Sequence, residues 1–209
     1  MNIFWDLDGT LTDPFDGITA AIRHALEASG LSAPPADELR WAIGPALIDT
    51  FAKLNVPDPE RALGFYRQHY IAGGLFRARI YDGIPEVLAA LQSAGHQMYL
   101  MTAKPHAYAG KITRHFGLSQ FLVAEYGPEL DGTRNDKALL LAHALKDLDM
   151  RSASAVMIGD RSYDFIAARK NAMPSIAAAW GHGTPDEHQL ADHICTEPAK
   201  IAEIVSDLG

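Results

Sequence analysis

Short apolar runs alternate with segments of helical periodicity along most of this 209-residue chain. Such alternation is typical of an α/β fold, in which helices connect the strands of a parallel sheet. Several runs are apolar throughout, as expected for strands that are covered on both faces. Strands are predicted at Asn2–Trp5, Gln97–Met101, Phe121–Ala124, Ala155–Ile158 and Ser175–Ala179, with His193–Cys195 as the candidate for a short sixth strand.

Helices are predicted between the strands, where apolar residues recur at intervals of three and four. Gly95 and Gly117 each follow one of these segments, and a glycine at that place commonly ends a helix. The predicted helices are Ile84–Ser93, His106–Phe116, Lys137–Leu148, Tyr163–Lys170 and Ala199–Asp207.

The alternation is interrupted from Asp16 to about Gly74, where the pattern indicates three or four helices and no strand. The first of these helices has an apolar stripe of Ile18, Ala21, Ile22, Ala25 and Leu26. We interpret this segment as an α-helical cap inserted after the first strand. The sequence therefore predicts an α/β core at residues 1–13 and 81–209, and a cap at residues 14–80.

The net charge of −8 argues against nucleic-acid binding through a broad basic face. We find no apolar run long enough to cross a membrane and no signal segment, so a cytoplasmic location is expected. Cys195 is the single cysteine, which excludes an internal disulfide. The sequence does not indicate whether the protein is a monomer or a homodimer.

Two aspartates follow the first predicted strand in the sequence Asp6-Leu7-Asp8-Gly9-Thr10. In an open parallel sheet, ligands bind at the carboxyl ends of the strands. Carboxylates at that place can bind a hard cation, or can divide the work of nucleophile and general acid/base. The alternative interpretation is a surface turn, because Asp and Gly are common turn residues.

A second pair of acids, Asp160 and Asp164, follows the strand predicted at Ala155–Ile158. Each also has a structural interpretation, as a helix cap or as an acid in the first helical turn. If the two strands are neighbours, three or four carboxylates meet, and their repulsion requires a cation between them. We expect a divalent metal at this place.

Two further residues complete a candidate phosphate site. Thr102 ends the strand predicted at Gln97–Met101, where its hydroxyl and nearby N–H groups can hold phosphate oxygens. Lys137 begins a predicted helix, where a positive charge is unfavourable for the helix dipole and indicates an anionic partner. Taken alone, a residue such as Thr102 is more often a helix cap, and one such as Lys137 is more often a solvated surface lysine.

The four elements, in this order, resemble the four motifs of the haloacid dehalogenase superfamily: Asp-x-Asp-Gly-Thr, a threonine at a strand end, a helix-borne lysine and Gly-Asp-x-x-x-Asp. The resemblance covers essentially the whole chain. Leu130–Arg134, Met157–Arg161 and Trp180-Gly181-His182-Gly183 look like the phosphoglycolate phosphatase branch, although Ala103 replaces a common Ser and His182 a common Tyr. The resemblance implies a Rossmann-like parallel sheet flanked by helices, with a helical cap.

The resemblance also implies a Mg²⁺-dependent phosphatase that acts on a small phosphorylated metabolite. Asp6 would be the nucleophile that forms an aspartyl-phosphate, and Asp8 the general acid/base. The residues implied to bind phosphate are Leu7, Thr102, Ala103 and Lys137. The groups implied to hold Mg²⁺ are Asp6, the backbone carbonyl of Asp8, Asp160, and Asp164, the last through water or by orienting the others.

The alternatives concern the substrate and the class of reaction. A 5′-nucleotidase and a sugar-phosphate mutase of the β-phosphoglucomutase type share these motifs, whereas a dehalogenase lacks the acid at Asp8. A non-catalytic binding protein would lack one of the acids. In the cap, the loop Ile43–Pro45 is the candidate for substrate contact. Arg23, Arg40 and Lys53 are candidates for a second anionic group or, more simply, surface charges.

Overall fold

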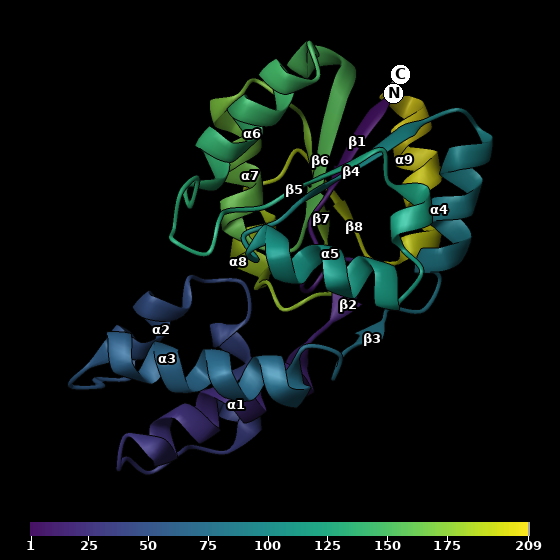
Figure 1. Ribbon diagram of the computed structural model, residues 1–209. Coiled ribbons are helices and arrows are strands. Elements are labelled where there is room, and N and C mark those ends of the chain that lie inside the picture. Colours follow the sequence, from purple (N-terminus) through teal and green to yellow (C-terminus); the bar gives the residue numbers. More distant parts are fainter. Residues whose placement is uncertain (209) are drawn as a thin grey trace. The chain divides into compact units, whose positions relative to one another are not determined.

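The computed structural model describes residues 1–208, and its α/β part is built on a six-stranded sheet (Figure 1). The strand order is β5-β4-β1-β6-β7-β8, and all neighbours in it are parallel. The predicted fold class is therefore confirmed. The strands are β1 (Asn2–Trp5), β4 (Gln97–Met101), β5 (Ala124–Tyr126), β6 (Ala155–Gly159), β7 (Ser175–Ala178) and β8 (His193–Cys195).

Helices cover both faces of this sheet (Figure 1). They are α4 (Ile84–Ser93), α5 (His106–His115), α6 (Lys137–Asp147), α7 (Ser162–Lys170), α8 (Pro185–His188) and α9 (Ile201–Asp207), with short 3₁₀ helices at Ser119–Phe121, Ser152–Ser154 and Pro198–Lys200. Helices α6 and α7 pack on one face, whereas α4 and α9 contact each other on the other face.

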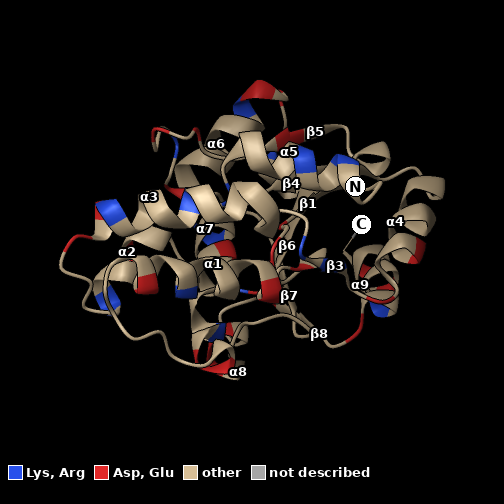
Figure 2. Cartoon of the chain, turned by 60° about the horizontal axis from the view of Figure 1, so that its bottom comes forward, with Lys and Arg blue, Asp and Glu red and all other residues tan. Residues whose placement is uncertain are grey.

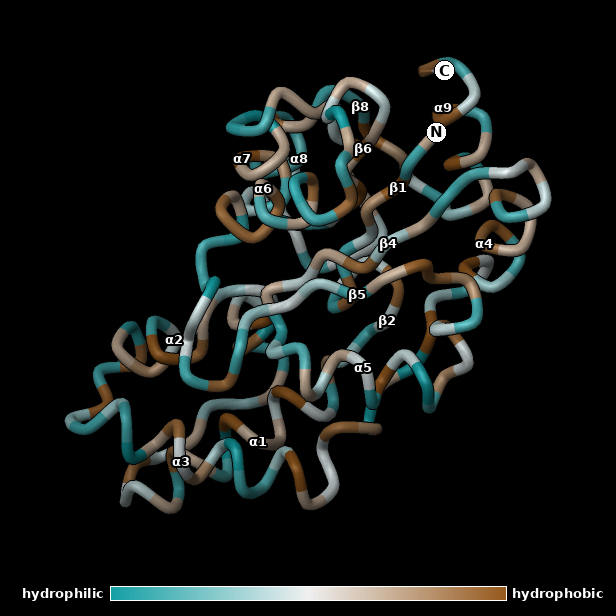
Figure 3. Tube along the Cα trace, turned by 45° about the horizontal axis from the view of Figure 1, so that its top comes forward, coloured by the Kyte–Doolittle hydropathy of each residue, from teal (hydrophilic) through white to brown (hydrophobic). Residues whose placement is uncertain are grey.

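The centre of the sheet is apolar because β1 lies between β4 and β6 and is covered on both sides. Asn2 pairs with Gln97 in β4 and with Ala155 in β6, so the three strands end at nearly the same level. Phe4 stacks on Tyr99 with ring centroids 5.0 Å apart and packs in one cluster with residues of α6 and α7. Figure 3 shows hydrophobic and hydrophilic stretches alternating along the helices, as helices with one buried face require.

The chain divides into two compact units, one made of Met1–Thr12 with the chain from Ile80 onward, the other of Asp13–Arg79. The two connections between the units form a short two-stranded sheet of β2 (Thr12–Asp13) and β3 (Arg79–Ile80). The second unit is helical and contains α1 (Phe15–Ala28), α2 (Leu47–Lys53), α3 (Pro59–His69), a 3₁₀ helix at Ala36–Ala42 and a π-helical turn at Tyr70–Gly74.

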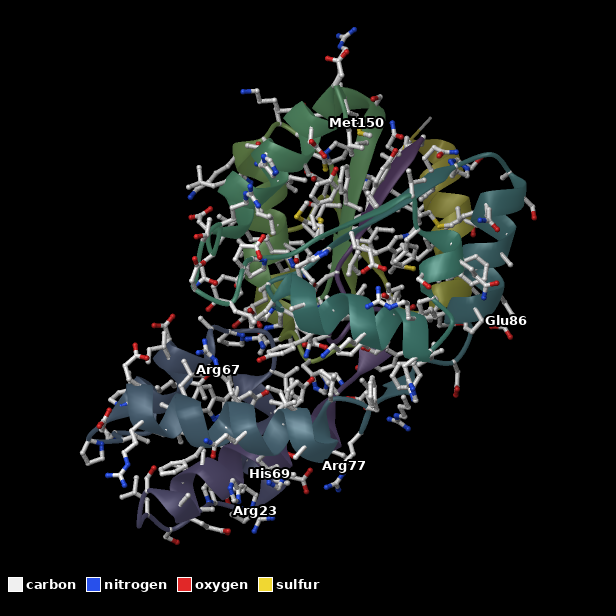
Figure 4. All side chains as sticks on the ribbon, viewed as in Figure 1. Arg23, Arg67, His69, Arg77, Glu86 and Met150 are labelled. Carbon is white, nitrogen blue, oxygen red and sulfur yellow. The ribbon has the colours of Figure 1, made fainter. Side chains whose placement is uncertain are left out.

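The helical unit has its own core, in which the predicted stripe of α1 is buried against α3. Phe51, Tyr66 and Tyr70 form an aromatic cluster within it. His24 of α1 stacks on His69 of α3 with ring centroids 4.4 Å apart. Burial lowers the pKa of His69, and the positive charges of His24 and of Arg77 lower it further. Figure 4 labels His69 and Arg77 on this unit, and Figure 2 shows basic residues on α1, α2 and α3.

Two predicted elements are placed differently. The apolar run Phe121–Ala124 is not a strand along its length, because Ser119–Phe121 is a 3₁₀ helix and the paired residues begin at Ala124. The strand is Ala124–Tyr126, which pairs with Tyr99–Met101 of β4. The last predicted helix begins at Ile201 rather than Ala199, since Pro198–Lys200 forms a 3₁₀ turn before it. None of the helices in the described part of the chain is long and apolar enough to cross a membrane.

Candidate active site

Three neighbouring strands deliver polar residues to the same edge of the sheet. Asp6 follows β1, Thr102 follows β4 and Asp160 follows β6. Because β1 lies between the other two and all three run in parallel, their carboxyl ends meet. The N–H group of Asp6 donates to the carbonyl oxygen of Ile158 at 2.9 Å, which holds the Asp6 backbone against the end of β6.

The turn after β1 depends on Gly9. The carbonyl oxygen of Leu7 accepts hydrogen bonds from the N–H groups of Thr10, Leu11 and Thr12, which closes the turn. Gly9 has a φ of +83°, a conformation that residues with a side chain rarely adopt. A Cβ atom at Gly9 would lie 2.2 Å from Oδ2 of Asp160, so the absence of a side chain also lets the two loops approach each other.

Asp6, Asp160 and Asp164 form a buried cluster of carboxylates. One oxygen from each lies within 4.8 Å of the others. Asp164 is the third residue of α7, where its Oδ2 accepts from the N–H group of Arg161 at 3.0 Å. Asp160 accepts at Oδ2 from the N–H group of His182 at 2.7 Å. The sequence expectation of acids meeting at the ends of two neighbouring strands therefore matches the geometry.

The electrostatics of this cluster favour a cation. Burial raises the pKa of Asp160 well above its usual range, and the negative charges of Asp6 and Asp164 raise it further. Burial raises the pKa of Asp164 to about 6, although Lys137 opposes this. Oδ1 of Asp160 is buried and has no hydrogen-bond partner among the described residues. The carboxylate oxygens of this cluster, including the unpaired Oδ1 of Asp160, fit a hard divalent cation such as Mg²⁺.

Lys137 supplies positive charge next to the cluster. Its Nζ lies 2.8 Å from Oδ1 of Asp6 and also forms an ion pair with Asp164. Burial disfavours the charge on Lys137, but Asp164 and Asp6 outweigh this effect and raise its pKa. Asp136 caps α6 by accepting from the N–H groups of Ala138 and Leu139, which sets the helix start that carries this lysine. Lys137 is therefore a buried lysine with anionic partners, not a surface lysine.

Asp8 lies near a second lysine, Lys104, which no sequence motif singled out. Oδ2 of Asp8 lies 2.8 Å from Nζ of Lys104, and both side chains are nearly buried. Burial raises the pKa of Asp8, and the charge of Lys104 opposes this increase. No local pattern marks Lys104, because its partner lies far away in the sequence.

Thr102 lies at the same edge, and its side chain contacts the backbone of its own loop. Its hydroxyl oxygen accepts from the N–H group of Lys104 at 3.1 Å, and its own N–H group donates to the carbonyl oxygen of Tyr126. Ala103 is exposed in the following loop, whereas Leu7 is fully buried. Only the backbone groups of Ala103 and Leu7 are suited to bind phosphate oxygens.

The loop after β7 contacts the loops that carry Asp8 and Asp160, and the sequence alone did not indicate a role for it. Trp180 Nε1 donates to the carbonyl oxygen of Thr10 at 3.0 Å. Glu187 accepts from Nε of Arg161 at 3.1 Å and from the hydroxyl of Ser162 at 2.9 Å. Burial opposes the charge on Glu187, but its hydrogen bond to the Thr184 backbone and the charge of Arg161 lower its pKa to about 2.

Two of the three basic residues considered for substrate contact, Arg40 and Lys53, have partners within the helical unit. Arg40 lies over the ring of Phe15 at 4.3 Å and pairs with Asp37 at 3.2 Å. Lys53 lies over the ring of Trp41 at 4.0 Å. These contacts agree with the simpler interpretation of surface charges. Arg23 is exposed, and Ile43–Pro45 follows the 3₁₀ helix Ala36–Ala42.

The fold and the site define a parallel α/β protein with buried aspartates and lysines at the carboxyl ends of its central strands, where such sheets bind ligands. The chain belongs to the haloacid dehalogenase-like hydrolase family, whose model matches residues 3–178. The resemblance seen in the motifs is thus confirmed.

Relatives extend this result over the whole chain. A 5′-nucleotidase of Pseudomonas aeruginosa is 39% identical over 98% of this chain and 95% of that protein. The tyrosine-protein kinase PtkA of Mycobacterium tuberculosis is 35% identical over 99% of this chain and 72% of that protein. A phosphoglycolate phosphatase of Xanthomonas campestris is 28% identical over 96% of this chain and 94% of that protein.

A solved structure gives the same picture. The crystal structure of a predicted phosphatase from Clostridium acetobutylicum has a TM-score of 0.94 and 32% identity, covering 99% of this chain and 98% of that chain. The family match and the named relatives confirm the predicted enzyme class, a phosphoric monoester hydrolase of the haloacid dehalogenase type.

Proposed function

We propose that this protein is a Mg²⁺-dependent phosphatase that hydrolyses a small phosphomonoester through an aspartyl-phosphate on Asp6. The observation that supports it most is the buried cluster of Asp6, Asp160 and Asp164, with oxygens within 4.8 Å of one another and Lys137 beside it. A phosphoryl group carries negative charge, so a site with this many acids requires cations to bind it.

Asp6 is the nucleophile. Its carboxylate oxygen attacks phosphorus, and Lys137 holds Oδ1 of the same carboxylate at 2.8 Å, which restricts its orientation. Asp8 donates a proton to the leaving oxygen. It then takes a proton from the water molecule that hydrolyses the aspartyl-phosphate. Burial raises the pKa of Asp8, which favours the protonated form that a general acid requires.

Mg²⁺ would be held by the carboxylates of Asp6 and Asp160 and by the backbone carbonyl of Asp8. Asp164 would contribute through a water molecule or by orienting the other groups. When bound, the ion supplies positive charge that offsets the charge of the transferred phosphoryl group. Lys137 and the hydroxyl of Thr102 bind phosphoryl oxygens, together with the backbone N–H groups of Leu7 and Ala103.

The substrate is a small phosphorylated metabolite. Phosphoglycolate is the candidate indicated by the motifs and by the 28% identical relative. A nucleoside 5′-monophosphate is the second candidate, because the 39% identical relative is named a 5′-nucleotidase. We propose that the helical segment 14–80 is a cap that contacts the part of the substrate beyond its phosphoryl group, and that this contact selects between the two candidates. We also propose that the enzyme is cytoplasmic.

The test is phosphate release by the purified protein with Mg²⁺ from a panel containing phosphoglycolate, nucleoside 5′-monophosphates and sugar phosphates. The panel is repeated with a chelator and with Asp6→Asn. Release that requires both Mg²⁺ and Asp6 supports the proposal, and the highest kcat/KM names the substrate class. Full activity of Asp6→Asn would refute the nucleophile, and isomerisation of a sugar phosphate without release would indicate a mutase.

A further inference from the structure

Lys104 is a buried lysine of the site that has no part in the reaction proposed above. Its side chain is 6% exposed, and its Nζ lies 2.8 Å from Oδ2 of Asp8. Among the described residues, Lys104 and Lys137 are the buried lysines. Because burying an ammonium group is costly without a charged partner, its position next to Asp8 indicates a role there. The two cations serve different acids: Lys137 lies beside Asp6 and Lys104 beside Asp8.

The backbone of Lys104 is fixed from two sides. Its N–H group donates to the hydroxyl oxygen of Thr102 at 3.1 Å, immediately after β4. Its carbonyl oxygen packs closely against Gly127, where a Cβ atom would lie 2.6 Å from it. The side chain of Lys104 therefore starts from a fixed position at the end of β4, so it can hold the side chain of Asp8 in the loop after β1.

The two carboxylate oxygens of Asp8 differ in their contacts. Lys104 engages Oδ2, whereas Oδ1 is buried and has no hydrogen-bond partner among the residues that the structure describes. A carboxyl group that rotates freely would exchange its two oxygens. The ion pair with Lys104 makes them different and leaves Oδ1 for the proton that is transferred.

We infer that Lys104 is a positioning residue that holds the Asp8 carboxyl group for protonation of the leaving oxygen. This inference rests on the proposed phosphatase function. As an oxygen of Asp6 bonds to phosphorus, the bond from phosphorus to the leaving oxygen breaks. Its electron pair remains on that oxygen, which takes the proton from Oδ1 of Asp8. Lys104 keeps its own protons throughout.

The test compares two leaving groups with Lys104→Met, purified and assayed with Mg²⁺. The phenol of para-nitrophenyl phosphate departs readily without a proton, whereas the alcohol of glycerol 2-phosphate requires one. Values of kcat/KM are compared, because they report the steps up to departure of the leaving group. We expect kcat/KM to fall on the order of 100-fold for the alkyl ester and by less than about 10-fold for the aryl ester.

Three controls separate positioning from folding. Lys111→Met makes the same change at an exposed lysine of α5 and should leave both values unchanged. Lys104→Arg keeps the charge and should restore most of the alkyl ester activity. Adding Lys104→Met to Asp8→Asn should cause no further selective loss. If Lys104→Met does not fold, as judged by circular dichroism, Lys104→Gln is used in the same comparison.

The outcomes are distinct. A selective loss on the alkyl ester that Lys104→Arg repairs supports the inference. Equal losses on both esters, or no loss on either, overturn it even when the wild-type protein is an active phosphatase. A wild-type protein that releases no phosphate, or one that does not need Asp6, overturns the proposed function, and the inference fails with it.

Discussion

Replacing Lys137 by methionine removes the cation beside the carboxylate cluster and keeps a side chain of similar length. Lys137 contacts both Asp6 and Asp164, and all three side chains are less than a tenth exposed. Removing one partner of a buried ion pair costs about 3–5 kcal/mol, because the remaining charge is left without compensation. Each kcal/mol lowers the melting temperature of a protein of this size by about 2–4 °C, so we expect a decrease of about 6–20 °C.

The assay is thermal unfolding at neutral pH with a chelator and then with increasing Mg²⁺. In Lys137→Met no ammonium group offsets the repulsion among the three acids, so Mg²⁺ should raise the melting temperature more than it does in the wild-type protein. Lys146→Met, at an exposed position of the same helix α6, is the matched control and should change stability by less than about 0.5 kcal/mol. If Lys137→Met and Lys146→Met have the same melting temperature, the ion pairs of Lys137 do not stabilise the fold, and this reasoning is refuted.

Three other predictions follow from the geometry. Gly9→Ala should weaken Mg²⁺ binding in calorimetry and reduce kcat, because the new Cβ atom would lie 2.2 Å from Oδ2 of Asp160. The control is Gly30→Ala, which also has a positive φ but no atom within 4 Å of the new Cβ atom, and it should reduce stability alone. Glu187 has a pKa lowered from 4.5 to about 2, so it stabilises the fold above pH 4.5, and that contribution is lost as the pH falls toward 2. Chemical denaturation should show a flatter acid limb for Glu187→Gln, and an unchanged limb would contradict this. The pKa of His69 is lowered from 6.5, so folding favours its neutral form, and stability decreases as the pH falls below 6.5. His69→Phe keeps a ring for stacking and should remove part of that decrease, which the same denaturation series would detect.

The sequence was sufficient to predict the polar residues at the strand ends. Asp6 and Asp160 each follow a short apolar run, and in an α/β chain an acid at that place marks the carboxyl end of a buried strand. The neighbouring positions of β4, β1 and β6 then bring Thr102 to the same edge. The strand predicted at Phe121–Ala124 was misplaced because an apolar run does not reveal where strand pairing begins. Phe121 ends a 3₁₀ helix, Val123 donates to the carbonyl oxygen of Met98 at 2.8 Å, and the strand itself is Ala124–Tyr126.

Lys104 and Glu187 were not predicted because their roles depend on partners distant in the sequence. Nothing near Lys104 distinguishes it from a surface lysine, and its pairing with Asp8 requires the turn at Gly9 to have formed. Glu187 is the third residue of α8 and forms a capping box with Thr184, which accounts for it locally. Its contacts with Arg161 and Ser162 appear only when the loop after β7 folds against the start of α7.

The charges of the site can be balanced by its two buried lysines together with the divalent ion of the proposed function. Asp6, Asp8, Asp160 and Asp164 carry four negative charges when ionised, and the buried ammonium groups of Lys104 and Lys137 compensate two of them. One divalent cation compensates the remaining two, which permits all four carboxylates to be ionised in a buried place. A phosphomonoester then enters a site that is close to neutral rather than strongly negative.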